Sequence, residues 1–170
     1  MSEPINSGFE DLWRANEDYT KSFKYRDLTG RAARGLAIVT CMDSRINPLS
    51  VVGMKSGDAK ILRNAGARVT QDVLRTLVLA TYLLGVDRIL VMPHTDCRMA
   101  QEDEEVIHAM IEEKHGVDTR SLEFNTVVDQ RAALSQDLAR IRAFPLIPKN
   151  VIVSGGIYHV ATGKIEPIDN

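Results

Sequence analysis

Short apolar runs alternate with longer stretches of helical periodicity along most of this chain. The runs are rich in β-branched or other strand-forming residues and lie at 36–40, 59–63, 88–92 and 151–153. Apolar residues recur between them at spacings of three and four, the period of an amphipathic helix, over 70–84, about 100–114 and 125–142. This alternation predicts an α/β fold with a mainly parallel β-sheet flanked by helices on both faces.

The end of the chain is expected to form late strands joined by tight turns. The run at 151–153 is followed by the Gly155-Gly156 pair, then by a second apolar run at 157–160 and by Gly163. Because glycine adopts turn conformations without steric cost, we expect two separate strands with a turn at the glycine pair.

The N-terminal segment predicts a helical arm. Over residues 8–24 one helical face gathers most of the large side chains, namely Phe9, Leu12, Trp13, Asn16, Tyr19 and Phe23. Such a stripe is typical of a helix that covers either the core or a partner subunit. At 170 residues the chain has the length of one domain, with an N-terminal helical arm at 1–30 and the core at 31–170.

Composition and charge exclude several classes of function. A formal net charge of −2 and a pI near 6.1 leave no basic excess of the kind that nucleic acid or anionic membranes select. The longest apolar run is interrupted by Thr81 and Gly85 before it reaches the length of a membrane helix. The first residues are acidic where a signal peptide is basic. We therefore expect a cytoplasmic protein that binds neither nucleic acid nor membranes.

Two cysteines and one histidine are placed where a metal site can form. Cys41 closes the first predicted strand, and His94 and Cys97 follow the third as an H-x-x-C pair. Ligands bind at the carboxyl ends of parallel strands, and two cysteines with one histidine form a set that zinc accepts with its fourth position open for catalysis. Iron and cobalt remain alternatives for such a site.

The alternative interpretation is structural. Each cysteine could be a small buried hydrophobe, and His94 a core histidine with its hydrogen bonds satisfied. Asp43 and Arg45 favour the metal site, because a carboxylate and a guanidinium beside Cys41 are costly to place at a buried strand end without a purpose.

The pattern C-x-D-S-R, followed about fifty residues later by H-x-x-C, resembles the β-class carbonic anhydrases of the short bacterial and archaeal type. The similarity extends through GDAKILRNAG, VMPHTDC and YHVATGKIEPI and covers most of residues 20–168. It implies one Zn²⁺ per chain held by Cys41, His94 and Cys97, with Asp43 and Arg45 as a catalytic dyad. It also implies reversible hydration of carbon dioxide to bicarbonate by zinc-bound hydroxide, in a homodimer or a tetramer whose arms embrace the partner.

Two positions depart from the family pattern. Arg98 stands after the second cysteine, where glycine is common, and could narrow the site, attract bicarbonate or point outward. His159 stands where related chains often carry aspartate. The alternatives to a carbonic anhydrase are a carbonyl sulfide or carbon disulfide hydrolase on the same fold and a non-catalytic zinc-binding protein.

Three further expectations concern the backbone turn, the pH response and the proton export of the predicted site. Gly66, in the RNAG segment, is expected to permit a sharp turn beside the metal pocket. Resemblance also suggests that Asp43 could leave Arg45 and become a fourth zinc ligand at lower pH. For proton export, His108, His115 and His159 are candidates by their chemistry alone.

Overall fold

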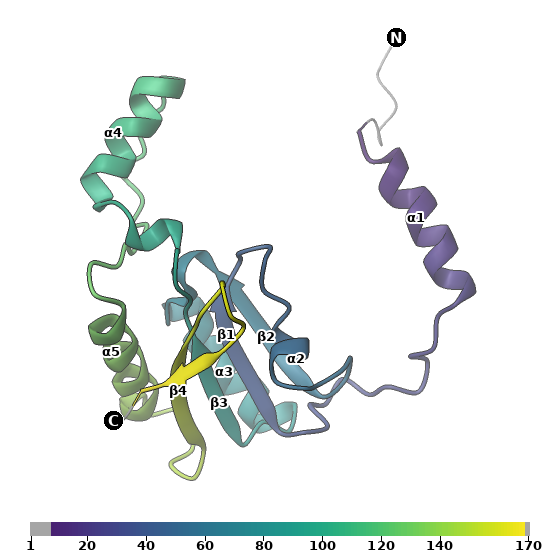
Figure 1. Cartoon of the computed structure of the whole chain (residues 1–170). Helices are drawn as coiled ribbons and strands as arrows, with labels where there is room; N and C mark the ends of the chain where they lie inside the picture. Colours follow the sequence, from purple (N-terminus) through teal and green to yellow (C-terminus); the bar gives the residue numbers. More distant parts are fainter. Residues whose placement is uncertain (1–7, 169–170) are drawn as a thin grey trace.

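The elements of the fold follow the predicted alternation of strands and helices (Figure 1). This computed structural model describes residues 8–168. The strands are β1 (Leu36–Cys41), β2 (Ala59–Asn64), β3 (Arg88–Met92), β4 (Ile152–Tyr158) and β5 (Ile165–Pro167). The helices are α1 (Glu10–Lys21), α2 (Pro48–Val51), α3 (Gln71–Leu83), α4 (Glu104–His115) and α5 (Gln130–Ala143), with two 3₁₀ turns, η1 (Ala65–Ala67) and η2 (Arg98–Ala100). The α/β fold class is confirmed.

The strands form one sheet of five in the order β2-β1-β3-β4-β5. The first four are parallel, and β5 pairs with β4 in the antiparallel direction. In the ladder, Cys41 lies opposite Asn64 of β2, and Thr40 lies opposite Met92 of β3. The three neighbouring strands therefore end together, and the segments that leave them start at the same edge of the sheet.

Apolar side chains cover both faces of the sheet, by different means. On one face, α3 and α5 pack against β1 and β3, with Leu77 and Leu138 fully buried between the layers. On the other face, Ile38 and Met92 pack against Ile46 near α2 and Met99 in η2. The second face is thus covered by a helix of four residues and by turns.

The predicted turn at Gly155-Gly156 is wrong, because β4 runs straight through both glycines. Neither glycine has a positive φ. A Cβ on Gly155 would lie 2.9 Å from side-chain atoms of Leu134 and Leu138 in α5, and a Cβ on Gly156 would lie 2.6 Å from Ile165 of β5. The glycines allow the close approach of neighbouring elements, and the turn comes later, where Gly163 donates to the carbonyl of His159.

Helix boundaries differ from the predicted ones where local capping decides. The helix predicted at 125–142 begins at Gln130, since the Asp129 side chain accepts from the amides of Arg131 and Ala132. The helix predicted at 100–114 begins at Glu104, after η2. The short α2 was not predicted, although Asn47 caps it and Pro48 opens it.

The predicted N-terminal helix forms as α1 and stands apart from the sheet in Figure 1. None of its residues is buried, and its aromatic rings pack in sequence-local pairs such as Phe9 with Trp13 and Tyr19 with Phe23. The stripe therefore does not cover the core of its own chain. Residues 1–7 of the predicted arm lie outside the described residues.

No described helix is both long and apolar enough to cross a membrane.

The packing of α3 predicts unequal effects for two leucines of the same helix. Leu77 is fully buried and Leu83 is 63% exposed. Leu77→Ala should lower the free energy of unfolding by about 2–5 kcal/mol, because it leaves a cavity in the core. Leu83→Ala should change it by less than about 0.5 kcal/mol. Urea denaturation followed by circular dichroism measures both, and equal losses would contradict the burial of this helix face.

Candidate metal centre

Three side chains that are far apart in the sequence meet at the carboxyl edge of the sheet. Cys41 is the last residue of β1, and His94 and Cys97 lie on the turn that leaves β3. All three are buried, and their ligand atoms lie within 4.8 Å of one another. The structure thus brings the predicted ligand residues together as a group that could hold a metal ion.

The hydrogen bonds of His94 prepare its ring for a metal. Nδ1 lies 2.8 Å from the carbonyl oxygen of Thr95, to which it donates, and Gln130 Nε2 donates to the backbone carbonyl of His94 at 2.6 Å. Among the described side chains, His94 Nε2 is the only buried nitrogen or oxygen atom that has no hydrogen-bond partner. With Nδ1 engaged in this way, Nε2 faces the place where the two sulfurs converge, which is the arrangement of a metal-ligating histidine.

The separation of the two sulfurs matches a tetrahedral zinc site. Cys41 Sγ and Cys97 Sγ are 4.0 Å apart. Two sulfurs at about 2.3 Å from a tetrahedral zinc ion are separated by about 3.8 Å. Both cysteines are free of disulfides. The donor set and its spacing therefore fit a tetrahedral zinc ion.

The electrostatics of the two thiols also favour a bound cation. The hydrogen bond from Cys97 holds the pKa of the Cys41 thiol well below its usual value. The same hydrogen bond, together with burial, raises the pKa of Cys97. Two thiolates this close repel each other, so a divalent cation between them is what allows both to be charged. The Gly66 amide donates to Cys41 Sγ at 3.4 Å and stabilises that negative charge.

Asp43 and Arg45 form an ion pair at the mouth of the site. Arg45 donates from Nη2 to Asp43 Oδ2 at 2.7 Å and from Nε to Oδ1 at 3.0 Å, and its backbone amide also reaches Oδ1. Arg45 therefore holds the pKa of the Asp43 carboxyl well below its usual range. Asp43 Oδ2 lies 3.8 Å from His94 Nε2, so this carboxylate stands beside the place where the ligand atoms converge.

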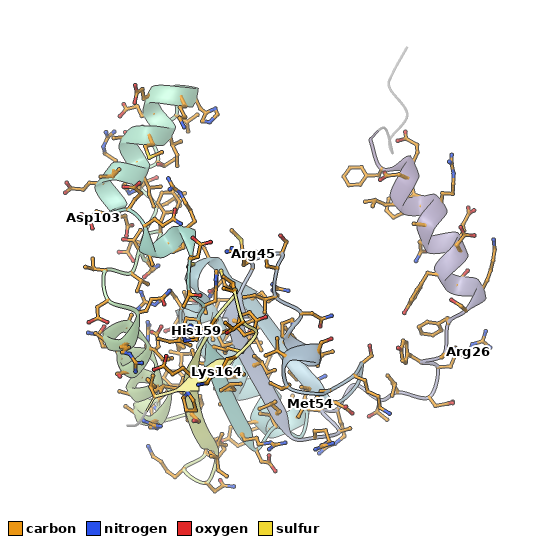
Figure 2. All side chains as sticks on the ribbon, viewed as in Figure 1. Arg26, Arg45, Met54, Asp103, His159 and Lys164 are labelled. Carbon is orange, nitrogen blue, oxygen red and sulfur yellow. The ribbon has the colours of Figure 1, made fainter. Side chains whose placement is uncertain are left out.

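Asp96 is a member of the site that the sequence did not single out. Its carboxylate accepts from Arg45 Nη1 at 2.8 Å, and its carbonyl accepts from Arg45 Nη2 at 3.0 Å. Asp96 has a φ of 55°, so it is one of the described non-glycine residues in the left-handed region. Its place between His94 and Cys97 in the H-x-x-C turn is the signal that could have identified it. Figure 2 shows Arg45, which Asp96 and Asp43 share, at this edge of the sheet.

Arg98 points away from the ligand group. Its guanidinium donates to Gln101 Oε1 at 3.1 Å and to the sulfur of Met110 at 3.6 Å, and it lies 3.8 Å from Glu102. The backbone at Arg98 has no positive φ, so a side chain is tolerated there. Of the three alternatives considered for this residue, the structure shows the outward one.

The candidate proton-export histidines have partners outside the ligand group. His108 hydrogen-bonds Thr119 and packs on Phe124, and His159 bonds Glu166 at 3.0 Å. His115 is the last residue of α4. None of these contacts joins a histidine to Cys41, His94, Cys97 or Asp43 in the described part of the chain.

Gly66 occupies the predicted sharp turn, in η1, with a φ of 79°. Its amide faces Cys41, as described above, and a Cβ at this position would lie 3.3 Å from the Cβ of Met99. Glycine therefore serves both the left-handed backbone and the close packing beneath the ligand group.

Comparison with known proteins gives a consistent result. A family model described as carbonic anhydrase matches residues 36–165. The chain is 34% identical over 160 residues to β-carbonic anhydrase 1 of Mycobacterium tuberculosis, covering 94% of this chain and 96% of the relative. It is also 32% identical over 156 residues to a carbon disulfide hydrolase of Saccharolobus solfataricus, covering 78% and 76%.

Solved structures agree with this assignment. The crystal structure of a carbonic anhydrase from Streptococcus mutans superposes with a TM-score of 0.88 at 35% identity, covering 99% of this chain and 100% of the other. The family match, the full-length relatives and the shared fold together place the chain in one group: it belongs to the β-carbonic anhydrase family of enzymes.

Proposed function

We propose that this protein is a zinc-dependent carbonic anhydrase that catalyses the reversible hydration of carbon dioxide to bicarbonate. The observation that carries the proposal is the group of Cys41, His94 and Cys97, with the unpaired His94 Nε2 directed at it and an arginine-bound carboxylate beside it. A structural zinc site has no need of the Asp43–Arg45 pair, whereas a site that orients a reacting hydroxyl does.

The three ligands would hold one Zn²⁺ per chain. Two thiolates and a neutral imidazole balance its charge and suit zinc better than iron or cobalt. Zinc in such a site supplies a nucleophilic hydroxide near neutral pH, because it lowers the pKa of the water in its open position.

Asp43 would orient the nucleophile. An ionised carboxylate only accepts hydrogen bonds, and Arg45 keeps Asp43 ionised. Arg45 occupies lone pairs on both carboxylate oxygens, while Oδ2 faces the ligand group. Asp43 Oδ2 would therefore accept the hydrogen of a hydroxyl at the site and leave an oxygen lone pair free for the carbon of carbon dioxide.

Arg45 would act as a positioning residue for Asp43. Its guanidinium is held between Asp43 and Asp96, one from the turn after β1 and one from the turn after β3. The planar fork of arginine makes several hydrogen bonds of fixed geometry, so the carboxylate of Asp43 is fixed in direction as well as in charge. The proposed switch, in which Asp43 becomes a zinc ligand, requires this ion pair to break.

A carbon disulfide or carbonyl sulfide hydrolase is the second candidate. Carbon disulfide hydrolases are among the relatives at about 30% identity. Carbon disulfide is linear like carbon dioxide, and the same nucleophile would attack its central carbon. The longer coverage of the carbonic anhydrase relatives favours carbon dioxide as the substrate. A non-catalytic zinc-binding role is the third candidate, and Asp43 and Arg45 oppose it.

We also propose that the chain works as a homodimer or a tetramer. The aromatic stripe of α1 is about half exposed, with Trp13 at 52% and Tyr19 at 51%, and exposed apolar surface of this kind is typical of subunit contacts. In this proposal residues 1–170 form one domain, with the arm at 1–30 and the catalytic core at 31–170. The reduced cysteines that the site requires fit the cytoplasm.

Metal content tests the ligand set. The wild-type protein should contain about one zinc ion per chain. Cys97→Ser should lose most of it, because a hydroxyl is a poor replacement for a thiolate. Inductively coupled plasma mass spectrometry measures the ratio. Met42→Leu is the matched control, since Met42 lies next to Cys41 but is 68% exposed. Full zinc in Cys97→Ser would refute the proposed ligand set.

Stopped-flow carbon dioxide hydration tests the reaction. Zinc-loaded wild-type protein should be active, and Asp43→Asn should lower kcat/KM about 10- to 100-fold, the usual effect of losing a group that orients a metal site. Asp72→Asn is the matched control, because Asp72 also pairs with an arginine but lies on α3, exposed to solvent. It should keep full activity.

Two results of this assay would contradict the proposal. Zinc-loaded protein that hydrolyses carbon disulfide or carbonyl sulfide and does not hydrate carbon dioxide would establish the second candidate. Zinc-loaded protein that is inactive with all three substrates would establish the non-catalytic role.

The mass of the protein in solution tests whether the α1 arm joins subunits. Light scattering after size exclusion should give at least twice the 18.9 kDa of one chain. Trp13→Ala should shift the population toward smaller species, because it removes a large ring from the α1 stripe. Val128→Ala, at a residue 91% exposed in a loop before α5, should leave it unchanged. A monomeric wild-type protein would contradict the proposed assembly.

A further inference from the structure

A buried ion pair joins the turn beneath the metal ligands to a helix of the core. Among the residues that the structure describes, Asp137 of α5 is the only Asp or Glu that is buried, with 4% of its surface exposed. Arg68 donates from Nε to Asp137 Oδ2 at 2.8 Å and from Nη2 to Oδ1 at 3.4 Å. The two residues lie 69 positions apart in the sequence and also line a small cavity that reaches Cys97.

Arg68 is held at its backbone as well as at its side chain. Asn64, at the end of β2, accepts from the Arg68 amide through Oδ1 at 2.9 Å and donates through Nδ2 to the Arg68 carbonyl at 2.7 Å. The Arg68 guanidinium also donates to the carbonyl of Asn125 at 3.3 Å. The η1 turn between Asn64 and Arg68 is therefore closed at its base by one amide side chain and anchored from outside by α5.

The turn that is held in this way has a strained backbone. Gly66 has a φ of 79° and Ala67 a φ of 59°. The left-handed region is unfavourable for alanine, and such a conformation persists where the surroundings impose it. Ala67 is only 1% exposed. The anchored Arg68, which follows it directly, is the residue through which α5 can impose it.

This backbone conformation allows one hydrogen bond to the ligand group, from the Gly66 amide to Cys41. With Gly66 and Ala67 left-handed, the Gly66 amide donates to Cys41 Sγ at 3.4 Å. An N–H donor on a thiolate withdraws charge from the sulfur. A metal bound to that sulfur then receives less electron density, so its acidity depends on whether the Gly66 amide stays in place.

We propose that Arg68 and Asp137 are positioning residues that hold the Gly66 amide on the sulfur of Cys41. The pair acts on the metal centre through the η1 turn and touches neither substrate nor metal. This inference rests on the proposed metal site.

A purely structural role for the same pair is the rival explanation, and it makes different predictions. Replacing a buried ion pair by apolar residues is often neutral for stability. A structural pair could thus be replaced without any change at the metal, whereas a positioning pair could not.

The test uses the full-length protein loaded with cobalt or with zinc. In Asp137→Asn, the sulfur-to-cobalt charge-transfer band should move to lower energy, because the thiolate loses a hydrogen bond. The Gly66 amide should exchange faster with deuterium in the zinc form. The zinc dissociation constant should rise about tenfold, the low end of what the loss of a partner group around a metal site causes.

Two further variants separate positioning from stability. Leu138→Ala removes a fully buried side chain next to Asp137 on the same helix. It should lower the melting temperature and leave the cobalt band and the Gly66 amide unchanged. Arg68→Met combined with Asp137→Leu removes both charges, so it remains informative if Asp137→Asn does not fold. It should shift the cobalt band as Asp137→Asn does.

An unchanged band and an unchanged Gly66 exchange rate in a folded variant of the pair would overturn the inference, as would an equal band shift in Leu138→Ala. These results are distinguishable from a failure of the proposed metal site. A wild-type protein that gives no sulfur-to-cobalt band at all would refute the site, whereas a normal band in every variant would refute only the role of the pair.

Discussion

The parallel register of β1 with β2 and β3 decides which side chains meet at the carboxyl edge of the sheet. The ladder sets Cys41 opposite Asn64 and Thr40 opposite Met92, so three strands end at one level. Two residues beyond these ends come Asp43, Gly66 and His94. A carboxylate, an amide donor and an imidazole are thereby brought around the sulfur of Cys41 from three separate parts of the chain. A slip of one residue in either ladder would separate them and reverse the faces of the strand.

The charges of the thiols, the Asp43 carboxylate and the Arg45 guanidinium at this edge of the sheet depend on one another. Two thiols with sulfurs 4.0 Å apart and the Asp43 carboxylate, 3.8 Å from His94, concentrate negative charge in a largely buried place. Arg45 compensates the carboxylate from the solvent side, and the Gly66 amide compensates Cys41 from beneath. With both thiols ionised, two negative charges would remain, and a divalent cation would balance them. The donor set is therefore compatible with a metal ion, and packing alone does not explain it.

Much of this could be predicted from the sequence, because the relevant signals are local. Strand and helix periods predict the α/β fold, and residues at the ends of parallel strands are known to meet. The Gly155-Gly156 pair misled the prediction, since two glycines suit a turn as well as a close approach, and only the packing of Leu134, Leu138 and Ile165 decides between them.

Contacts across long distances in the sequence could not be predicted. Arg68 and Asp137 are ordinary charged residues 69 positions apart, and nothing local connects them. The outward direction of Arg98 depends on Gln101 and Met110, which become its neighbours only once η2 and α4 have formed.

The proposed function depends on zinc held by Cys41, His94 and Cys97. X-ray absorption spectroscopy at the zinc edge of the purified protein tests it most directly. We expect two sulfur ligands at about 2.3 Å and one imidazole nitrogen at about 2.0–2.1 Å, with a single light atom completing the tetrahedron. A zinc environment of nitrogen and oxygen alone would contradict it.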